Sequence, residues 1–322
     1  MAETILFSGL DGQGNVVTQP LSIATASPAV KPLMGASTSS NTTWTTLTNA
    51  VGTFQARRTY GSTIPASFAA SQAGSAGDAA AGRASYWSFK PTMSTFGSTG
   101  TTEQNALRAF LRTVPVGHRF TIICYHEPED NINAGSFTLA QWKAAVQKTG
   151  EIVDEINVEK GANSRLRNGI CLMGPWTFDS RSAYDTWDWT FTPLQLASVD
   201  VVCIDPYRWN PGDASMEIML TRDDFGTLTT TARATMTKLA AWGKPVVLSE
   251  WGCTSTGVTD ANRAAWVRAT WDWFKSFTVA HPELPFEAVL YFHNNLDVGS
   301  DPRATWEVLA SGQEQSRQAL ID

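Results

Sequence analysis

The chain has 322 residues, of which 43% are hydrophobic, and it carries a net charge of −6 at pH 7. This length and apolar content suffice for one large α/β domain with a buried core. The acidic balance and the absence of long basic runs argue against a nucleic-acid partner, because nucleic-acid binding needs clustered Lys and Arg to displace counterions.

Residues 1–28 are polar and rich in turn signals, and they predict a short hairpin-like N-terminal extension. We expect it either to close one end of the main domain or to dock onto a partner. Its first residues lack the basic and apolar regions of a secretory signal peptide, so none is expected. No run of about 18 apolar residues occurs, so we expect no membrane insertion. The sequence leaves the location of the protein open.

From residue 29 to 322, short apolar segments alternate with segments of helical periodicity, as expected for strands that are buried on both faces. The predicted strands are Pro32–Ser37, Thr53–Tyr60, Ala84–Phe89, Arg119–Tyr125, Asn168–Met173, Val199–Ile204, Pro245–Ser249 and Ala288–Phe292. The predicted helices are Thr43–Val51, Thr102–Thr113, Thr138–Val158, Thr230–Trp242, Ala261–Phe277 and Arg303–Ala319.

Eight strands that alternate with helices throughout predict an α/β fold, a (β/α)8 TIM barrel over residues 29–322. A doubly wound open sheet is the competing architecture. It favours a Gly-rich phosphate turn after the first strand, and the sequence has none there. The four cysteines are widely spaced, and three of them lie in predicted strands, so we expect buried free thiols and neither a disulfide framework nor a zinc site.

Two predicted strands end in a carboxylate. Glu127 follows the fourth strand, and Glu250 follows the seventh. Burying an ionised carboxylate at such a position costs several kcal/mol unless it is partnered, so packing alone explains neither residue. Barrel enzymes carry their chemistry at the C-terminal ends of the strands. We therefore expect these two carboxylates to face each other across the barrel mouth.

The motifs around these residues resemble a clan of barrel glycosidases whose catalytic Glu residues end strands four and seven. His126-Glu127-Pro128 resembles the acid/base motif, and the His before Glu resembles the glycoside hydrolase family 26 branch, which includes β-mannanases. The segment 249–252, Ser-Glu-Trp-Gly, resembles the nucleophile motif, and the segment 199–207 resembles the sixth strand. The chain departs from family 26 after the acid/base motif, at 129–131, and at the end of strand eight, at 291–294. These departures concern the substrate more than the reaction.

The resemblance implies a retaining glycoside hydrolase with Glu127 as acid/base and Glu250 as nucleophile. It also matches Tyr207 to a tyrosine that hydrogen-bonds the nucleophile. Glu127 is expected to be protonated at rest, its pKa raised by the nearby negative charge of Glu250. His126 is expected to bind a sugar hydroxyl or to orient a carboxylate. One of two adjacent arginines in the second strand, Arg57 or Arg58, is expected to face the nucleophile, and we favour Arg58.

Thirteen tryptophans supply flat aromatic faces that suit sugar rings. Trp176, Trp209 and Trp251 begin loops on the expected catalytic face and are candidate substrate contacts. Asp205 and His293, at strand ends, are further candidates. Open loops lined by Trp favour an extended polysaccharide cut internally. No cofactor or metal is expected.

Several other interpretations stay open at this stage. Glu127 and Glu250 could be structural strand-end residues. The acidic and His residues at 126–130 could suggest a metal site, but adjacent strand residues point to opposite faces. The fold could serve as a non-catalytic carbohydrate-binding barrel, or as a glycan-degrading domain of a larger particle such as a phage tail, with residues 1–28 as the docking element. A barrel aldolase or isomerase would need a strand-end Lys or a phosphate loop after strands seven and eight, and only Lys90 comes near this pattern.

Overall fold

The computed structural model describes residues 4–10, 16–22, 32–98, 100–178, 183–184, 186–208, 237–253, 258–280, 282, 284–293 and 312–321, with the backbone only at 4–10, 16–22, 175–176, 207–208, 280 and 321.

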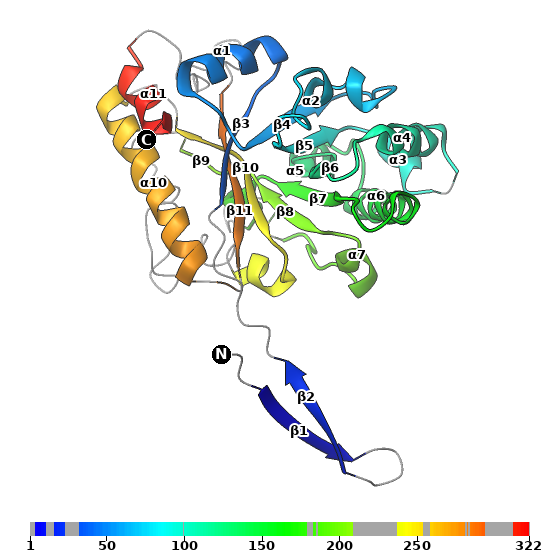
Figure 1. The fold of residues 1–322 in the computed structure, drawn as a ribbon. Helices are drawn as coiled ribbons and strands as arrows, with labels where there is room; N and C mark the ends of the chain where they lie inside the picture. The colour runs from blue at the N-terminus through cyan, green and yellow to red at the C-terminus, as the bar shows by residue number, and fades with distance from the viewer. Residues whose placement is uncertain are drawn as a thin grey trace.

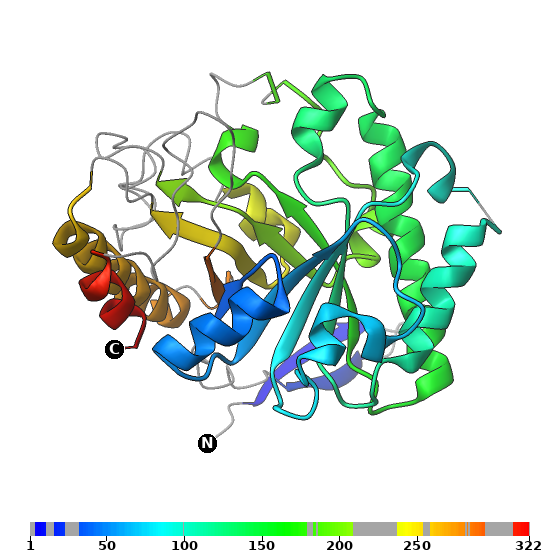
Figure 2. The ribbon, with the colours of Figure 1, turned by 90° about the horizontal axis from the view of Figure 1, so that it is seen from above.

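A closed barrel of eight parallel strands forms the centre of the molecule (Figure 1 and Figure 2). Neighbouring strands pair in chain order, and the last strand pairs with the first, so the sheet closes on itself. The predicted (β/α)8 barrel is thus confirmed. The eight strands are β3 (Leu33–Ser37), β4 (Ala56–Gly61), β5 (Ala84–Phe89), β6 (Phe120–Cys124), β7 (Leu166–Leu172), β8 (Val201–Ile204), β10 (Val246–Cys253) and β11 (Phe286–Phe292). A two-residue strand, β9 (Tyr207–Arg208), pairs with the end of β10.

Helices surround the barrel, and the long ones match the periodic segments of the sequence (Figure 2). They are α1 (Asn41–Val51), α4 (Thr102–Thr113), α6 (Leu139–Lys160), α10 (Asp260–Ala280) and α11 (Glu314–Ile321). Short helices occupy the connections: α2 (Gln72–Ser75), α3 (Met93–Phe96), α5 (Pro128–Asn133) and α7 (Pro193–Ala197). Of the helix predicted from Thr230 to Trp242, only 237–242 lies within the described residues, and it is helical. Of the helix predicted from Arg303 to Ala319, only 312–319 lies within the described residues, and it is helical from Glu314 onward.

Two separate apolar cores follow from the alternation of side chains along the strands. One lies inside the barrel and is made of aliphatic and cysteine side chains together with Tyr86. The larger one lies between the strands and the helices and holds most of the aromatic residues. Space inside the barrel is tight, because a Cβ added to Gly35 would lie 2.4 Å from the carbonyl oxygen of Ala56. All four cysteines are buried, as predicted.

The N-terminal segment forms its own two-stranded antiparallel sheet, separate from the barrel sheet. Its strands are β1 (Thr4–Leu10) and β2 (Val16–Ser22). Among the described residues, no helix is long and apolar enough to cross a membrane.

Candidate active site

The C-terminal ends of the barrel strands carry a cluster of charged side chains. Arg58 lies on β4, Glu250 lies on β10, and Asp205 follows β8. Glu127 lies between β6 and α5. The two carboxylates expected from the sequence are electrostatically coupled, because Glu250 is one of the groups that raise the pKa of Glu127. The fold therefore brings both carboxylates and Arg58 to one end of the barrel.

A β-bulge in β10 turns Glu250 toward the barrel interior. Between Leu248 and Trp251, β10 advances three residues while the paired strand β11 advances two. Strict alternation would direct Ser249 to the interior and Glu250 to the helix layer. The extra residue lets both side chains reach the guanidinium of Arg58, Ser249 at 2.7 Å and Glu250 at 3.2 Å.

Arg58 is the buried cation of this site. Its Nη1 donates to both carboxylate oxygens of Asp205, at 2.8 and 3.0 Å. Asp205 also accepts hydrogen bonds from Ser249 Oγ and Cys171 Sγ, so its side chain is engaged within the protein. Burial by itself lowers the pKa of Arg58, but its neighbours, led by Asp205 and including Glu250, raise it well above the ordinary value. Arg58 therefore stays charged and compensates both acids. Arg57 points to the opposite face of β4, toward α1.

Tyr60 is a second donor to Glu250, and the sequence analysis missed it. It lies two residues after Arg58 on β4, and therefore on the same side of the strand. Its hydroxyl donates to Glu250 Oε1 and shares a further hydrogen bond with Ser37 Oγ on β3. Burial raises the pKa of the Tyr60 phenol well above its ordinary value, so the hydroxyl keeps its proton and remains a donor. The even spacing from Arg58 is the signal that would have identified it.

Glu127 is held in a left-handed backbone conformation, with φ 48° and ψ 61°. Tyr125 also has a positive φ, of 54°. Non-glycine residues adopt this region at a cost of about 1–2 kcal/mol each. The Glu127 N–H donates to the carbonyl oxygen of Cys171 on β7 at 3.0 Å, which fixes the turn from β6 into α5. Strained backbone at a carboxylate-bearing turn is a recurrent property of functional sites.

The side chain of Glu127 is partly buried and surrounded by other acids. Burial makes the largest contribution to raising its pKa well above the usual range, followed by the negative charges of Asp205, Glu250 and Glu129, while Arg58 acts in the opposite direction. The surroundings of Glu127 therefore favour its protonated form.

His126 lies beside these residues at the barrel mouth. Its ring packs edge-on against Tyr60, with ring centroids 5.3 Å apart. Its Nδ1 is buried and has no hydrogen-bond partner within the described part of the chain. Burial, helped by the positive charges of Arg58 and Lys90, lowers the His126 pKa well below its ordinary value. The imidazole is thus neutral at physiological pH.

Four other residues expected at the site are described to different extents. Only the backbone is described for Tyr207, in β9, and for Trp176, in the 3-10 turn after β7, while Trp209 lies outside the described residues. Their side-chain contacts stay predictions. His293 is 1% exposed. Burial, helped by the positive charge of Arg263 on α10, lowers its pKa to about 4.

Trp251 requires a correction. The sequence analysis placed it among the substrate contacts, but it is fully buried in the layer between the barrel and α10. Its ring stacks on Trp266 with centroids 5.2 Å apart and meets Tyr291 edge-on at 5.6 Å. The bulge explains the difference, because the residue after the inward-facing Glu250 returns to the outer face. Trp251 is a packing residue.

The described residues contain no group of three or more His, Cys, Asp or Glu side chains that could hold a metal ion. The acids at the barrel mouth are compensated instead by the guanidinium of Arg58.

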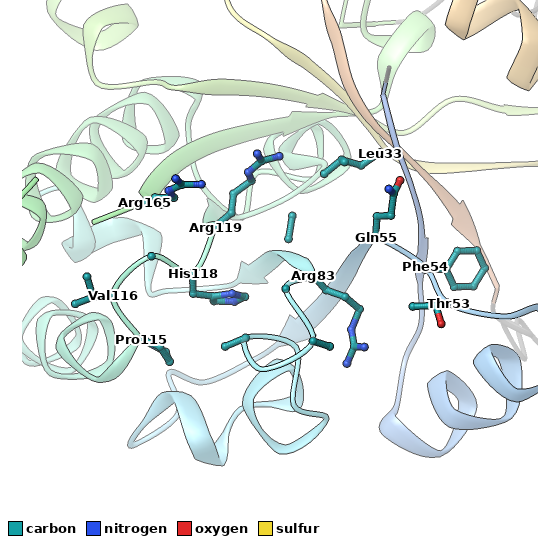
Figure 3. Close-up of a pocket in the computed structure, with 15 residues that line it drawn as sticks. Leu33, Thr53, Phe54, Gln55, Arg83, Pro115, Val116, His118, Arg119 and Arg165 are labelled. Atoms are coloured by element: carbon teal, nitrogen blue, oxygen red, sulfur yellow. The ribbon is translucent and has the colours of Figure 1, made fainter. Parts of the chain in front are cut away.

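A pocket of about 530 Å³ lies at the opposite end of the barrel, where the strands begin (Figure 3). Three arginines and a histidine from three connections line it, and no acidic residue does. They are Arg83, Arg119, Arg165 and His118. Arg83 pairs with Asp78 at 2.8 Å. Because the barrel core separates this pocket from the carboxylates, it takes no part in their chemistry.

Comparison with solved structures shows several barrels of similar fold. An active-site mutant of the Rhizomucor miehei β-1,3-glucanosyltransferase in complex with laminaritriose is 15% identical, and the match covers 88% of this chain and 94% of that one with a TM-score of 0.51. Fungal β-1,4-galactanases match at 10% identity over 91% and 99% of the two chains, with a TM-score of 0.52. A glucosidase from Croceicoccus marinus matches at 14% identity over 90% and 66%, with a TM-score of 0.54.

These likenesses establish the fold, and each of the three proteins is named for an activity on carbohydrate. The sequence itself matches no protein-family model and no curated protein.

Proposed function

We propose that this protein is a retaining O-glycoside hydrolase that cuts an extended polysaccharide internally. One observation carries the proposal: two carboxyls at one barrel mouth have opposite electrostatic surroundings. Glu250 receives a hydrogen bond from Tyr60 and lies 3.2 Å from the Arg58 guanidinium, so its environment favours the ionised form. Glu127 has its pKa raised by burial and by neighbouring acids. Surroundings that push the pKa values of two carboxyls apart support one as the acid and the other as the nucleophile.

The reaction follows from these two states by double displacement. Glu127 gives its proton to the glycosidic oxygen as the bond to the anomeric carbon breaks, while a Glu250 oxygen attacks that carbon and forms a glycosyl-enzyme ester. Glu127, now ionised, removes a proton from water, and the water oxygen displaces Glu250. The sugar leaves with retained configuration, and both carboxyls return to their initial states.

The neighbouring residues have positioning roles in this scheme. Arg58 and Tyr60 hold Glu250 ionised and in place, and Asp205 holds Arg58. Tyr207 is proposed as a further donor to Glu250, and the neutral His126 as a partner for a sugar hydroxyl. Trp176 and Trp209 remain the proposed aromatic contacts of the substrate.

The resemblance of 126–128 and 249–252 to family 26 supports a β-linked polysaccharide as substrate. The two neighbours named β-1,3-glucanosyltransferase and β-1,4-galactanase support the same class. We therefore propose β-mannan, β-1,3-glucan and β-1,4-galactan as the first substrates to test.

The N-terminal hairpin supports a second, contextual proposal. Because β1 and β2 pair only with each other in their own sheet, residues 1–28 are proposed as a docking element that joins the barrel to a larger assembly such as a phage tail. Pull-down of purified virion proteins with the whole chain and with a chain lacking 1–28 tests this. Equal capture by both chains contradicts it.

The catalytic proposal is tested by hydrolysis of this polysaccharide panel with wild type, Glu127→Ala and Glu250→Ala. Glu155→Ala, which alters a half-exposed acid on α6, is the control. We expect both site variants to lose at least about 10²-fold in kcat, and the control to match wild type. Azide should rescue Glu250→Ala with a glycosyl azide of inverted configuration, and Glu127→Ala with one of retained configuration.

A fall in viscosity that precedes the release of reducing ends would show internal cleavage. Full activity in either site variant would overturn the assignment. Binding of a glycan by wild type without any cleavage would favour a non-catalytic carbohydrate-binding barrel instead.

A further inference from the structure

Glu129, in the first turn of α5, is a buried acid that the proposed reaction does not use. It is 0% exposed although it carries a carboxyl group. Its Oε1 accepts hydrogen bonds from the backbone N–H of Met173 at 3.0 Å and from Thr177 Oγ1 at 2.5 Å. Its Oε2 is buried without a hydrogen-bond partner in the described part of the chain. An acid so placed is costly and calls for an explanation beyond packing.

The two hydrogen bonds of Glu129 join neighbouring connections at the barrel mouth. Met173 follows β7, and Thr177 lies in the 3-10 turn Gly174–Phe178 after it, whereas Glu129 belongs to the connection after β6. A second tie runs between the same two strands, from the Glu127 N–H to the carbonyl oxygen of Cys171 at 3.0 Å. Glu127 is therefore anchored to β7 through its own N–H, and to the connection after β7 through Glu129.

This anchoring matters because the segment adopts an unfavourable backbone conformation. Glu127 and Tyr125 are the two non-glycine residues with positive φ among those described. A residue released from the left-handed region returns to extended or right-handed backbone, which redirects its side chain. Without the Glu129 tether, the Glu127 carboxyl would leave the position from which it faces Glu250.

The carboxyl of Glu129 also acts on Glu127 through its charge. Burial raises the Glu129 pKa to about 7, with the Thr177 and Met173 hydrogen bonds opposing that rise. When ionised, Glu129 raises the pKa of Glu127 together with other groups that face it. Those groups are Asp205 after β8 and Glu250 on β10, which raise it, and Arg58 on β4, which lowers it.

We propose that Glu129 is a positioning residue for the acid/base: its carboxyl ties the left-handed Glu127 segment to the connection after β7 and adds a negative charge beside Glu127. This proposal rests on the proposed acid/base role of Glu127.

The test uses the full chain with Glu129→Ala, Glu129→Gln and Thr177→Val, and with Asp130→Asn as the control at the adjacent residue. Hydrogen exchange of the Glu127 amide reports the tether without reference to catalysis. We expect exchange at least about tenfold faster in Glu129→Ala and unchanged in the control. Because misplacement of a catalytic group mainly lowers turnover, kcat should fall about 10- to 100-fold in Glu129→Ala while KM changes little.

Glu129→Gln separates the tether from the charge. The amide oxygen keeps both hydrogen bonds, so kcat should stay within a few-fold of wild type. Loss of the negative charge should move the basic limb of the kcat/KM profile to lower pH, a shift that a merely structural residue would not produce. Thr177→Val keeps the acid and removes one bond, so it should give a smaller loss of kcat and serves if Glu129→Ala does not fold.

Unchanged amide exchange together with unchanged kcat in Glu129→Ala or Thr177→Val would overturn the proposal, as would a Glu129→Gln pH profile identical to wild type. If wild type cuts no glycan, the hydrolase proposal fails. The exchange data still decide whether Glu129 holds the segment, so the two failures are distinguishable.

Discussion

Arg58 and Arg57 provide a matched pair of substitutions, because they are adjacent on β4, both fully buried, and directed to opposite faces. We predict that Arg58→Met is strongly destabilising and that Arg57→Met is not. Methionine has a similar length and no charge, so the pair isolates the effect of the lost cation on each side of the strand.

The expected magnitude for Arg58→Met follows from its partners. Removing one member of a buried ion pair costs about 3–5 kcal/mol, because the other charge is left uncompensated. Arg58 compensates two acids, Asp205 at 2.8 Å and Glu250 at 3.2 Å, so we expect the free energy of unfolding to fall by about 5 kcal/mol. With an unfolding entropy of about 2.1 cal/mol/K per residue, a 322-residue chain then melts about 7 °C lower.

Arg57 is compensated much less well. Its Nη1 lies 3.9 Å from Asp78 Oδ2, and that acid keeps Arg83 at 2.8 Å when Arg57 is removed. Burial lowers the Arg57 pKa to about 10, despite the opposing charge of Asp78, which indicates a cation with little net stabilisation. The expected loss for Arg57→Met is about 1–2 kcal/mol, mainly from packing against α1.

Urea unfolding of both variants measures these losses, since urea does not screen charge as guanidinium does. Glycan hydrolysis should be lost in Arg58→Met and retained in Arg57→Met. Equal destabilisation of the two variants, or wild-type stability of Arg58→Met, would refute the account of Arg58 as the compensating cation of the site.

Three further predictions concern single groups. Tyr60→Phe removes a hydrogen bond to Glu250 and should lower kcat about tenfold with little change in KM, as steady-state kinetics will show; an unchanged kcat contradicts the role. Glu127→Gln should raise the melting temperature at pH 7, because a carboxyl whose pKa is raised in the folded state costs stability above its unfolded pKa. In calorimetry this gain should vanish below about pH 4, where the carboxyl is protonated in both states. A gain that persists there would count against the raised pKa of Glu127. Burial lowers the His118 pKa to about 4, so wild type should lose about 1–3 kcal/mol as the pH falls from 6.5 to 4, and His118→Gln should flatten this dependence in urea unfolding.

The sequence predicts the barrel well because the physics of its elements is local. Buried parallel strands appear in the sequence as short apolar runs, and helices appear as periodic ones. The predicted bounds agree with the structure for the strand β5, Ala84–Phe89, and for the helix α4, Thr102–Thr113. Thr138 and Gln141 form a capping box that fixes where α6 begins. The two strand-end acids, Glu127 and Glu250, were visible for a similar reason: an apolar strand that ends in a carboxylate is exceptional.

The remaining parts of the site depend on contacts between distant segments. Alternation shows that one of Arg57 and Arg58 faces the interior, but which one depends on the phase of β4 in the closed barrel. Tyr60 contacts Glu250 across the barrel mouth, and the two residues are 190 positions apart in the chain. The spacing from Arg58 shows which side of β4 Tyr60 is on, but the sequence does not show that it meets Glu250. Trp251 was placed wrongly because the strand was predicted to end at Ser249, whereas β10 continues to Cys253. The bulge then directs Trp251 outward, and nothing in the residue types of that strand reveals an extra residue.

The extra residue in β10 makes this site sensitive to strand length more than to composition. Deleting one residue between Leu248 and Trp251 would restore plain pairing with β11 and keep every apolar contact type, yet it would leave room for only one inward side chain where Ser249 and Glu250 now stand. A redesign that keeps the pattern of apolar residues but omits the extra residue would thus yield a folded barrel that lacks one of the two inward side chains. Conversely, an insertion of one residue at the matching position of a regular barrel strand is a minimal route by which such a fold acquires an inward-facing carboxylate.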